Sequence, residues 1–276
     1  MAFDPKTQIA NIAVVARETV RIERALQGWS EARWQLPTYC PGWRAADAVA
    51  HLATGSDFYA QVIAAGRQGV PQLPWGASDG AGMRAARAAA SKKLTDGGPV
   101  ALLAGFQQGA AALQEVLASL QEADLSKVAW HPRGLVPIGS WVGMRLMELV
   151  VHDWDIRQPQ ENPARRAPTA FPAMLTTLPE MHTQFLTQRL AGDLNGVHVL
   201  RAGDMAWAFR IQGKTVTYLA SAPTTYDTCL STDAESLILL SMGRADREAK
   251  RHSGALTIEG EATKAQQLCK TLFRTF

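Results

Sequence analysis

The sequence has little of what several protein classes need. Its three cysteines are far apart and form no Cys-x-x-Cys pair, so neither a disulfide framework nor a cysteine zinc site is expected. No apolar run approaches the ~20 residues that span a bilayer, which argues against a membrane protein. Lysine and arginine form no run interleaved with aromatic residues, so nucleic acid is not an expected partner.

The remaining composition is that of an ordinary globular protein. Of the 276 residues, 47% are hydrophobic and 19% charged, and the net charge of +3 is small. A chain of this length is long for one core and comfortable for two domains. The first residues, MAFDPKTQIANIA, lack a basic stretch followed by an apolar core. We therefore expect a cytoplasmic protein.

One stretch, WVGMRLMELVVHDWDI at residues 141–156, places polar residues on an otherwise apolar helix. Arg145, Glu148, His152 and Asp155 recur every three or four residues, so they share one stripe. Such a helix should be mostly buried, and a buried acid and histidine one turn apart need partners, of which a metal ion is one. On spacing alone, a solvated polar stripe on a surface helix is the competing interpretation.

A second predicted helix, at residues 43–65, repeats this arrangement. Arg44, Asp47, His51 and Thr54 share a stripe, with the same Arg-x-x-acid-x-x-x-His spacing as the first stretch. Metal sites in helical bundles are assembled from facing helices, so two imidazoles and a carboxylate could meet here. A three-ligand set leaves one coordination position open, which is the pattern of catalytic rather than structural sites.

The segments PTYCPGWRAADAVAHLATGS and GMRLMELVVHDWDIRQP resemble the two signature stretches of the mycothiol-dependent maleylpyruvate isomerase family, within the DinB-like superfamily of metal-dependent thiol transferases. The resemblance implies that His51, Glu148 and His152 hold a divalent metal. Zinc is the expected ion, although such a set also accepts nickel, cobalt, manganese or iron. The resemblance further implies mycothiol or another low-molecular-weight thiol as cosubstrate.

Apolar periodicity predicts two further helices, at residues 5–29 and 100–121. With the two polar-striped helices they would form a DinB-like four-helix bundle over residues 1–160. Glycines and prolines between residues 65 and 99 predict a long mobile insertion. Trp75 in that insertion is a candidate to close over the site, or else packs on the bundle.

The rest of the chain predicts a smaller second domain. Residues 161–172 are rich in proline and predict a linker, and residues 173–276 follow as an α+β domain with an antiparallel sheet. Its predicted strands are 197–201, 205–212, 215–219, 225–231 and 255–259, and its predicted helices are 173–190, 234–242 and 262–273. The stretch STDAESLILLSMGRADREAKRHSGALTIEGEATKAQQL resembles the sterol-carrier-protein-like C-terminal domain of the same family, which implies a cap on the metal domain.

The family uses an essential arginine from its second domain. The resemblance therefore implies such an arginine here, and Arg244 and Arg251 are the main candidates, while Arg201 and Arg210 lie on predicted strands. Arginine fits this task because its planar fork binds a carboxylate through two parallel hydrogen bonds and stays charged. Each of these residues could equally be an ordinary surface arginine.

Other candidate site residues lie close to the metal stretches in sequence. Asp47 could orient His51 or carry a proton, or be an exposed helix acid. His131 and Arg133, in the link AWHPRGLVPIGS, are candidate contacts for the anionic substrate or the cosubstrate, or ordinary loop residues. Cys40 is expected to be a small buried residue rather than a nucleophile.

The expected function is thiol chemistry at a metal: cis-trans isomerisation of, or S-transfer to, a small electrophile of the maleylpyruvate type. The protein would act as a monomer or homodimer. Two alternatives stay open, a non-catalytic protein that binds a small molecule or lipid, and a metal-dependent hydrolase whose metal activates water. Metal content separates the first alternative from the expected function, and activity without thiol separates the second.

Overall fold

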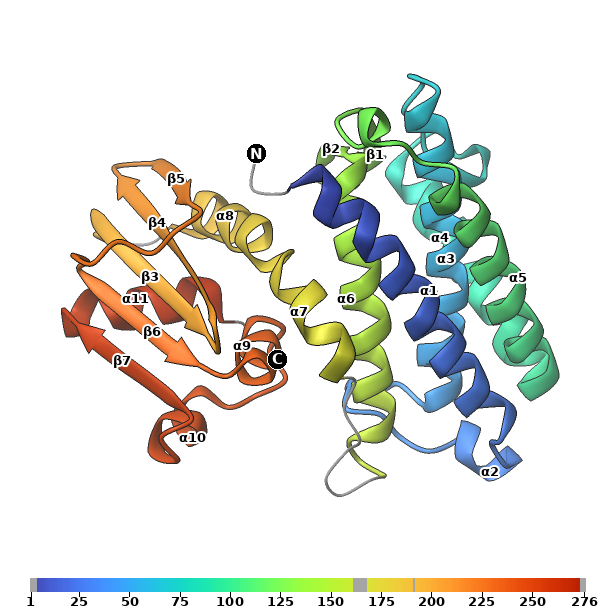
Figure 1. Cartoon of the computed structure of the whole chain (residues 1–276). Coiled ribbons are helices and arrows are strands. Elements are labelled where there is room, and N and C mark those ends of the chain that lie inside the picture. Colours follow the sequence, from blue (N-terminus) through green and yellow to red (C-terminus); the bar gives the residue numbers. More distant parts are fainter. Residues whose placement is uncertain (1–3, 161–167, 191, 274–276) are drawn as a thin grey trace. The chain divides into compact units, whose positions relative to one another are not determined.

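The computed structural model describes residues 4–160, 168–190 and 192–273. The chain divides into two compact units, Pro5–Ala170 and the residues from Phe171 onward (Figure 1). Of the predicted linker, residues 161–167 lie outside the described residues. The rest of the predicted linker forms the short helix η3 (Pro168–Ala170) and the start of α7 (Phe171–Leu175).

The first unit is built on a bundle of long helices. These are α1 (Pro5–Gln27), α3 (Ala45–Arg67), α5 (Gly98–Ala118) and α6 (Ile138–Arg157). Both α1 and α3 pack against α5 and against α6, as the ribbons in Figure 1 show. Apolar residues of α3 and α6 are buried on nearly all sides, which matches the prediction that the helix at residues 141–156 would be mostly buried. The predicted helical N-terminal domain is therefore confirmed.

A helix occupies the segment that was predicted to be a mobile insertion. After η1 (Pro74–Gly76), α4 (Gly80–Asp96) packs against α3 and α5. Asp79 caps this helix, because its Oδ1 accepts a hydrogen bond from the Gly82 backbone N–H at 2.7 Å. The prediction was wrong because the glycines and prolines all lie before residue 83 or after residue 96, whereas residues 83–96 are rich in alanine, arginine and lysine, which favour helix.

A β-hairpin occupies the segment that was predicted to be a plain link before α6. Strands β1 (Val128–His131) and β2 (Gly134–Pro137) pair in an antiparallel manner. The hairpin lies close against α3, since a β-carbon added at Gly66 would come within 2.6 Å of the Val128 carbonyl oxygen. Two short helices, α2 (Glu31–Trp34) and η2 (Glu122–Asp124), also belong to this unit.

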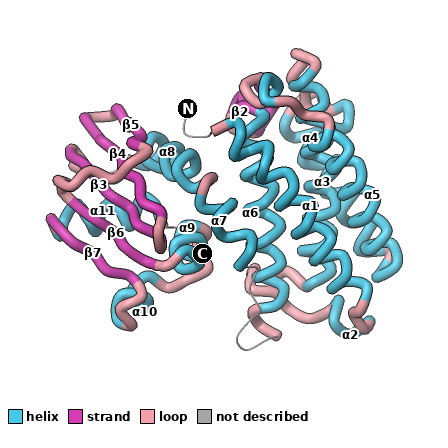
Figure 2. The backbone as a smooth tube through the Cα atoms, viewed as in Figure 1, coloured by secondary structure: helices cyan, strands magenta, loops and turns pink. Residues whose placement is uncertain are grey.

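The second unit is an α+β fold on a five-stranded sheet, shown by the magenta strands in Figure 2. The strands β3 (Gly196–Ala202), β4 (Met205–Gln212), β5 (Thr215–Leu219), β6 (Thr228–Thr232) and β7 (Leu256–Gly260) have the spatial order β5-β4-β3-β6-β7. Neighbouring strands are antiparallel except β3 and β6, which run parallel. The predicted fold class is confirmed.

The described residues of this unit form five helices: α7, α8 (Leu178–Arg189), α9 (Ala234–Ser241), α10 (Arg247–His252) and α11 (Ala262–Leu272). The predicted helix at 173–190 is divided between α7 and α8, and α10 was not predicted. Helices α8 and α11 pack against each other and against the sheet.

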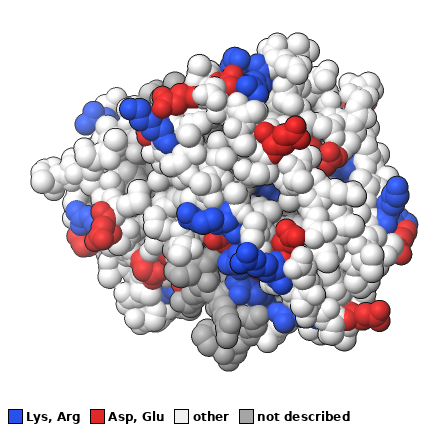
Figure 3. Space-filling model, turned by 45° about the vertical axis from the view of Figure 1, so that its right-hand side comes forward, with Lys and Arg blue, Asp and Glu red and all other residues white. Residues whose placement is uncertain are grey.

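Charge is mixed on the face of the molecule drawn in Figure 3, where acidic and basic side chains are scattered among uncharged ones. Within the described ranges, none of the helices combines the length and apolarity that crossing a bilayer requires.

Candidate metal centre

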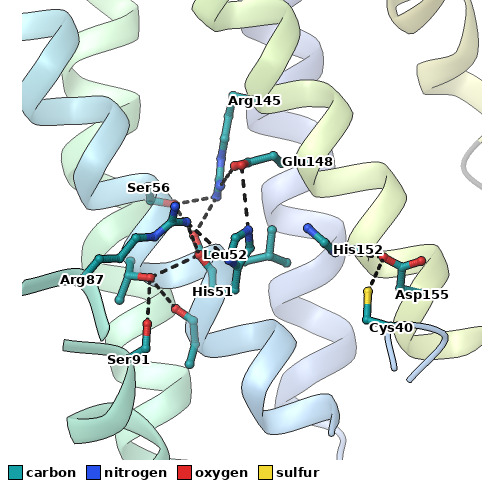
Figure 4. Close-up of polar contacts among 12 residues, drawn as sticks. Cys40, His51, Leu52, Ser56, Arg87, Ser91, Arg145, Glu148, His152 and Asp155 are labelled. Carbon is teal, nitrogen blue, oxygen red and sulfur yellow. Dashed lines mark hydrogen bonds and ion pairs between the residues drawn. The ribbon is translucent and has the colours of Figure 1, made fainter. Parts of the chain in front are cut away.

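The three predicted metal ligands lie together where α3 faces α6 (Figure 4). His51 Nε2 is 3.8 Å from Glu148 Oε1, and the ring centres of His51 and His152 are 4.9 Å apart. Ligand atoms around a tetrahedral zinc with bonds of ~2.1 Å are separated by ~3.4 Å, so the histidine–glutamate distance is close to that of a metal site. The side chains of His51 and Glu148 are 25% and 26% exposed, which leaves them accessible to a small ligand.

The protonation states at this centre suit a divalent ion. Burial lowers the pKa of His51 to about 4, so its imidazole is neutral at pH 7. Burial alone would raise the pKa of Glu148, but the neighbouring His51 and Arg145 outweigh it and hold that pKa below its usual value. The contact between His51 and Glu148 is therefore not an ion pair. It places a neutral imidazole beside a carboxylate, the forms that bind metal.

Arg145 connects the two helices and positions Glu148. This arginine is 1% exposed. Its Nη2 donates to the Leu52 carbonyl oxygen at 3.2 Å and to Ser56 Oγ at 2.6 Å on α3, while its Nη1 donates to Glu148 Oε2 at 3.4 Å. One carboxylate oxygen of Glu148 is thus held by Arg145, and the other faces His51.

Asp155 fixes the orientation of the His152 ring. It is fully buried, and its Oδ2 lies 2.9 Å from His152 Nδ1 and accepts a hydrogen bond from Cys40 Sγ at 3.2 Å. The ligand atoms of Cys40, His152 and Asp155 all lie within 4.8 Å of one another, so these residues form a second candidate metal group in the described structure. Hydrogen bonding accounts for this closeness without a metal, and it leaves His152 Nε2 available as a ligand.

Aromatic rings line the centre. The Trp43 ring lies parallel to that of His152, at 6.0 Å and 23°, and 5.1 Å from that of His51. Trp75 packs near Phe58 and is bound to α3, because its Nε1 donates to Asp57 Oδ2 at 2.5 Å. Of the two interpretations of Trp75, the structure therefore shows packing on the bundle.

Arg87 on α4 is a residue of this centre that the sequence analysis missed. Its Nη2 lies 3.4 Å from His51 Nδ1 and 3.4 Å from the His51 carbonyl oxygen (Figure 4). It was missed because the segment was predicted to be a loop. The available signal was the spacing of Met83, Arg87 and Ser91, which puts them on one stripe if the segment is helical.

Three other predicted residues have different surroundings. Asp47 caps the start of α3, where its Oδ2 accepts from the Arg44 backbone N–H at 2.9 Å and from Arg44 Nε at 3.1 Å. His131 packs against the Trp141 ring at 5.2 Å, and burial lowers its pKa to about 4. Arg133 is exposed, and its backbone N–H donates to His131 Nδ1.

The two predicted arginines of the second domain differ from each other. Arg244 follows α9 and is 7% exposed, with Nη1 donating to the Met242 carbonyl oxygen at 2.6 Å. Arg251 is exposed on α10, and its Nε lies 3.2 Å from Glu248 Oε2.

The chain matches two families. The mycothiol maleylpyruvate isomerase N-terminal domain family matches residues 15–157, and the SCP-2 sterol transfer family matches residues 179–273. No curated protein matches the sequence. Among solved structures, the chain is similar to a mycothiol-dependent maleylpyruvate isomerase and to a mutant of that enzyme. Each comparison gives 18% identity and a TM-score of 0.61, covering 95% of this chain and 96% of the other.

At this identity the structural similarity establishes the fold. The family match extends further, because it covers just over half of the chain and includes both helices that carry the polar stripes. The protein therefore belongs to the mycothiol maleylpyruvate isomerase N-terminal domain family and carries a second domain that resembles the SCP-2 sterol transfer family.

Proposed function

We propose that the protein is a metal-dependent enzyme that uses mycothiol, or a similar small thiol, for cis-trans isomerisation of a small unsaturated 2-oxo acid of the maleylpyruvate type or for S-transfer to it. The observation that carries this proposal is the convergence of two imidazoles and one carboxylate from facing helices. The similar structure named as a mycothiol-dependent maleylpyruvate isomerase supports the same chemistry.

His51, Glu148 and His152 would hold the divalent ion, with zinc as the expected metal. The donor set fits, since imidazole nitrogen and carboxylate oxygen are common zinc ligands and three protein ligands leave a position open. When bound, such an ion lowers the pKa of a coordinated thiol so that a thiolate nucleophile exists at neutral pH.

The surrounding residues keep these ligands in place. Asp155 accepts a hydrogen bond from His152 Nδ1, which keeps the proton on that nitrogen and leaves Nε2 free to bind. Arg145 restrains Glu148 through one oxygen. The Trp43 ring packs beside both histidine rings and restricts their movement. Together they pre-form the site before the substrate arrives.

The proposed reaction needs only addition and elimination. The thiolate adds to one carbon of the cis double bond, and the electron pair moves into the adjoining carbonyl group to give an enolate. The carbon–carbon bond that was double in the substrate is now single and can rotate. Return of the electron pair then re-forms the double bond in the trans geometry and expels the thiolate. In the S-transfer version the enolate carbon takes up the proton that the thiol gave up and the thioether adduct is retained, or a leaving group departs with its electron pair instead.

The second domain is proposed to act as a cap, with the domain limits 1–160 and 173–276 and the linker 161–172. Arg244 and Arg251 are the proposed sources of an arginine that assists the reaction, and His131 and Arg133 stay candidate contacts for the substrate or thiol. Replacing the correct arginine should reduce turnover without changing metal content. Full activity in both Arg244→Ala and Arg251→Ala would contradict this placement.

The test is an isomerase assay on metal-loaded protein. A cis unsaturated 2-oxo acid is incubated with and without mycothiol, and the trans product is followed by its ultraviolet absorbance. We expect turnover that requires thiol and is abolished in Glu148→Ala, with exposed Arg84→Gln as a matched control that stays active. Consumption of substrate without any thiol would instead indicate a hydrolase. Protein that binds no metal and has no activity would indicate a binding module.

A further inference from the structure

The inner face of α4 carries one charged residue. Met83, Arg87 and Ser91 recur at intervals of four residues, and Met83 is buried. Ser91 Oγ lies 3.2 Å from Thr54 Oγ1 on α3, and this contact holds α4 in register. Arg87 lies one helical turn before Ser91. Its guanidinium is over the Phe58 ring, 5.8 Å from the ring centre, and beside His51.

Arg87 differs from Arg145 in the groups that its guanidinium contacts. Arg145 is enclosed and donates to a carbonyl, a hydroxyl and a carboxylate. Arg87 is half-buried, and among the described residues no carboxylate lies within ion-pair distance of it. Its two hydrogen-bond contacts, both to His51, are 3.4 Å long, which is at the weak end of the range.

A glycine leaves room between these charged groups. A β-carbon added at Gly55 would lie 3.3 Å from Arg87 Nη2, 3.3 Å from Arg145 Nη1 and 3.4 Å from Glu148 Oε2. The two guanidinium groups and the carboxylate therefore border one small space on the surface of α3. Arg145 already neutralises Glu148, and a divalent ion on Glu148 would add further positive charge. Arg87 also acts electrostatically on Glu148 without forming an ion pair with it, so two guanidinium groups and one carboxylate leave this space with excess positive charge.

We propose that Arg87 binds a carboxylate group of the electrophile beside the metal position and so makes the site selective for anionic substrates. This inference rests on the proposed function and names a residue that recognises its substrate. A guanidinium suits the task because its fork of donors matches a carboxylate, and partial burial strengthens the pairing. The arginine comes from the first unit, so the proposal is independent of Arg244 and Arg251.

The test measures binding rather than turnover. Maleate, a small cis-dicarboxylate, is titrated into zinc-loaded protein by calorimetry, using wild type, Arg87→Gln, Arg87→Lys and the control Arg84→Gln. We expect roughly ten- to hundredfold weaker binding for Arg87→Gln, because a charge-assisted hydrogen-bond pair is lost. Arg87→Lys should recover only part of the affinity, since lysine lacks the fork. Arg84→Gln should bind as wild type does.

Titrations with two small thiols show whether Arg87 binds the electrophile or the thiol. Mercaptoacetate, a thiol with a carboxylate, and 2-mercaptoethanol, a thiol without one, are titrated into the same proteins. Weaker binding of mercaptoacetate, with maleate binding unchanged, would assign Arg87 to the thiol and overturn the proposal for the electrophile. Equal maleate affinity in wild type and Arg87→Gln, or no maleate binding by zinc-loaded wild type, would also overturn it.

Zinc content, measured on every variant, separates this inference from the proposed function. Arg87→Gln is expected to keep the zinc of the wild type. If wild type holds no zinc, maleate is titrated into the zinc-free protein. Binding that depends on Arg87 would then support the anion site while the proposed metal chemistry fails, and binding that does not would overturn both.

Discussion

His152 and Asp155 are joined by a 2.9 Å contact between Nδ1 and Oδ2, one turn apart on α6. The same oxygen of Asp155 accepts a hydrogen bond from Cys40. A fully buried carboxylate with these two partners has little freedom to move, so it fixes the plane of the imidazole ring.

We predict that Asp155→Asn weakens zinc binding by about ten- to a hundredfold, as expected when the partner of a ligand histidine is changed. The affinity can be measured by competition with a chromophoric chelator. Asp153→Asn is the matched control, because Asp153 lies on the same helix but pairs with Arg21 and Arg157. Equal zinc affinity in Asp155→Asn and the wild type would show that Asp155 does not support the ligand.

Two glycines of the bundle should respond differently to alanine. A β-carbon at Gly109 would come within 2.7 Å of the Ala53 carbonyl oxygen, so Gly109→Ala must move backbone and should cost about 1–3 kcal/mol of unfolding free energy. A β-carbon at Gly55 would meet side-chain ends at 3.3–3.4 Å and no backbone, and alanine favours helix by about 1 kcal/mol. Urea unfolding should therefore find Gly55→Ala at least as stable as the wild type.

Gly55→Ala should nevertheless weaken maleate binding, because the added methyl group enters the space between Arg87, Arg145 and Glu148. A variant that is stable but binds maleate poorly separates occupation of the site from loss of the fold. Unchanged maleate affinity would mean that the anion binds elsewhere.

Arg145→Met should destabilise the first unit by about 3 kcal/mol, because it removes the partner of Glu148 and leaves two acceptors on α3 without their donor. Arg87→Gln is the comparison and should change the unfolding free energy by no more than about 1 kcal/mol. Denaturant titrations of both variants check this difference. Equal stability of Arg145→Met and the wild type would contradict the structural role given to Arg145.

The stability of the second unit should fall in acid because of His182. Burial lowers the pKa of His182 to about 3, whereas an unfolded histidine has a pKa of about 6.5. The unfolded state therefore takes up the proton first. The contribution to stability is complete above pH ~6.5 and is lost by about 1.4 kcal/mol for each pH unit below that value, down to pH ~3.

This prediction is tested by measuring unfolding at pH 7 and pH 5 through tryptophan fluorescence. Trp207, the last tryptophan of the sequence, lies on β4 and so reports on the second unit. His182→Gln should show a shallower dependence on pH by about one proton. An identical slope in the variant and the wild type would remove His182 as the source of the acid sensitivity.

Long amphipathic patterns made much of the fold predictable. The apolar spacing of α1, with Ile12, Val15, Ile22 and Leu26 buried, places this helix within two residues of its observed end. Alternation and turn glycines located four strands of the sheet within one residue at each end, whereas β6 begins three residues later than predicted. The parallel pairing of β3 with β6 could not be predicted, because the sequence of a strand does not specify its neighbour.

The predicted ligand set came from spacing and resemblance, whereas the residues around the ligands could be identified only from the structure. Arg87 is 36 residues away from His51 in sequence, and the helix that brings it there was hidden by terminal glycines. For Asp47 the sequence suggested a contact that the structure replaces with another. Its spacing from His51 suggested contact, but capping of α3 engages its carboxylate with Arg44.

Metal analysis of the purified protein tests whether His51, Glu148 and His152 hold a metal ion. Wild type is compared with His51→Ala, Glu148→Ala and His152→Ala, with helicity measured beside the zinc content and Arg84→Gln as control. We predict about one zinc per chain in the wild type and the control, and almost none in the three ligand variants at nearly unchanged helicity. A wild type that cannot be loaded with zinc, or ligand variants that retain it fully, would contradict the proposed centre.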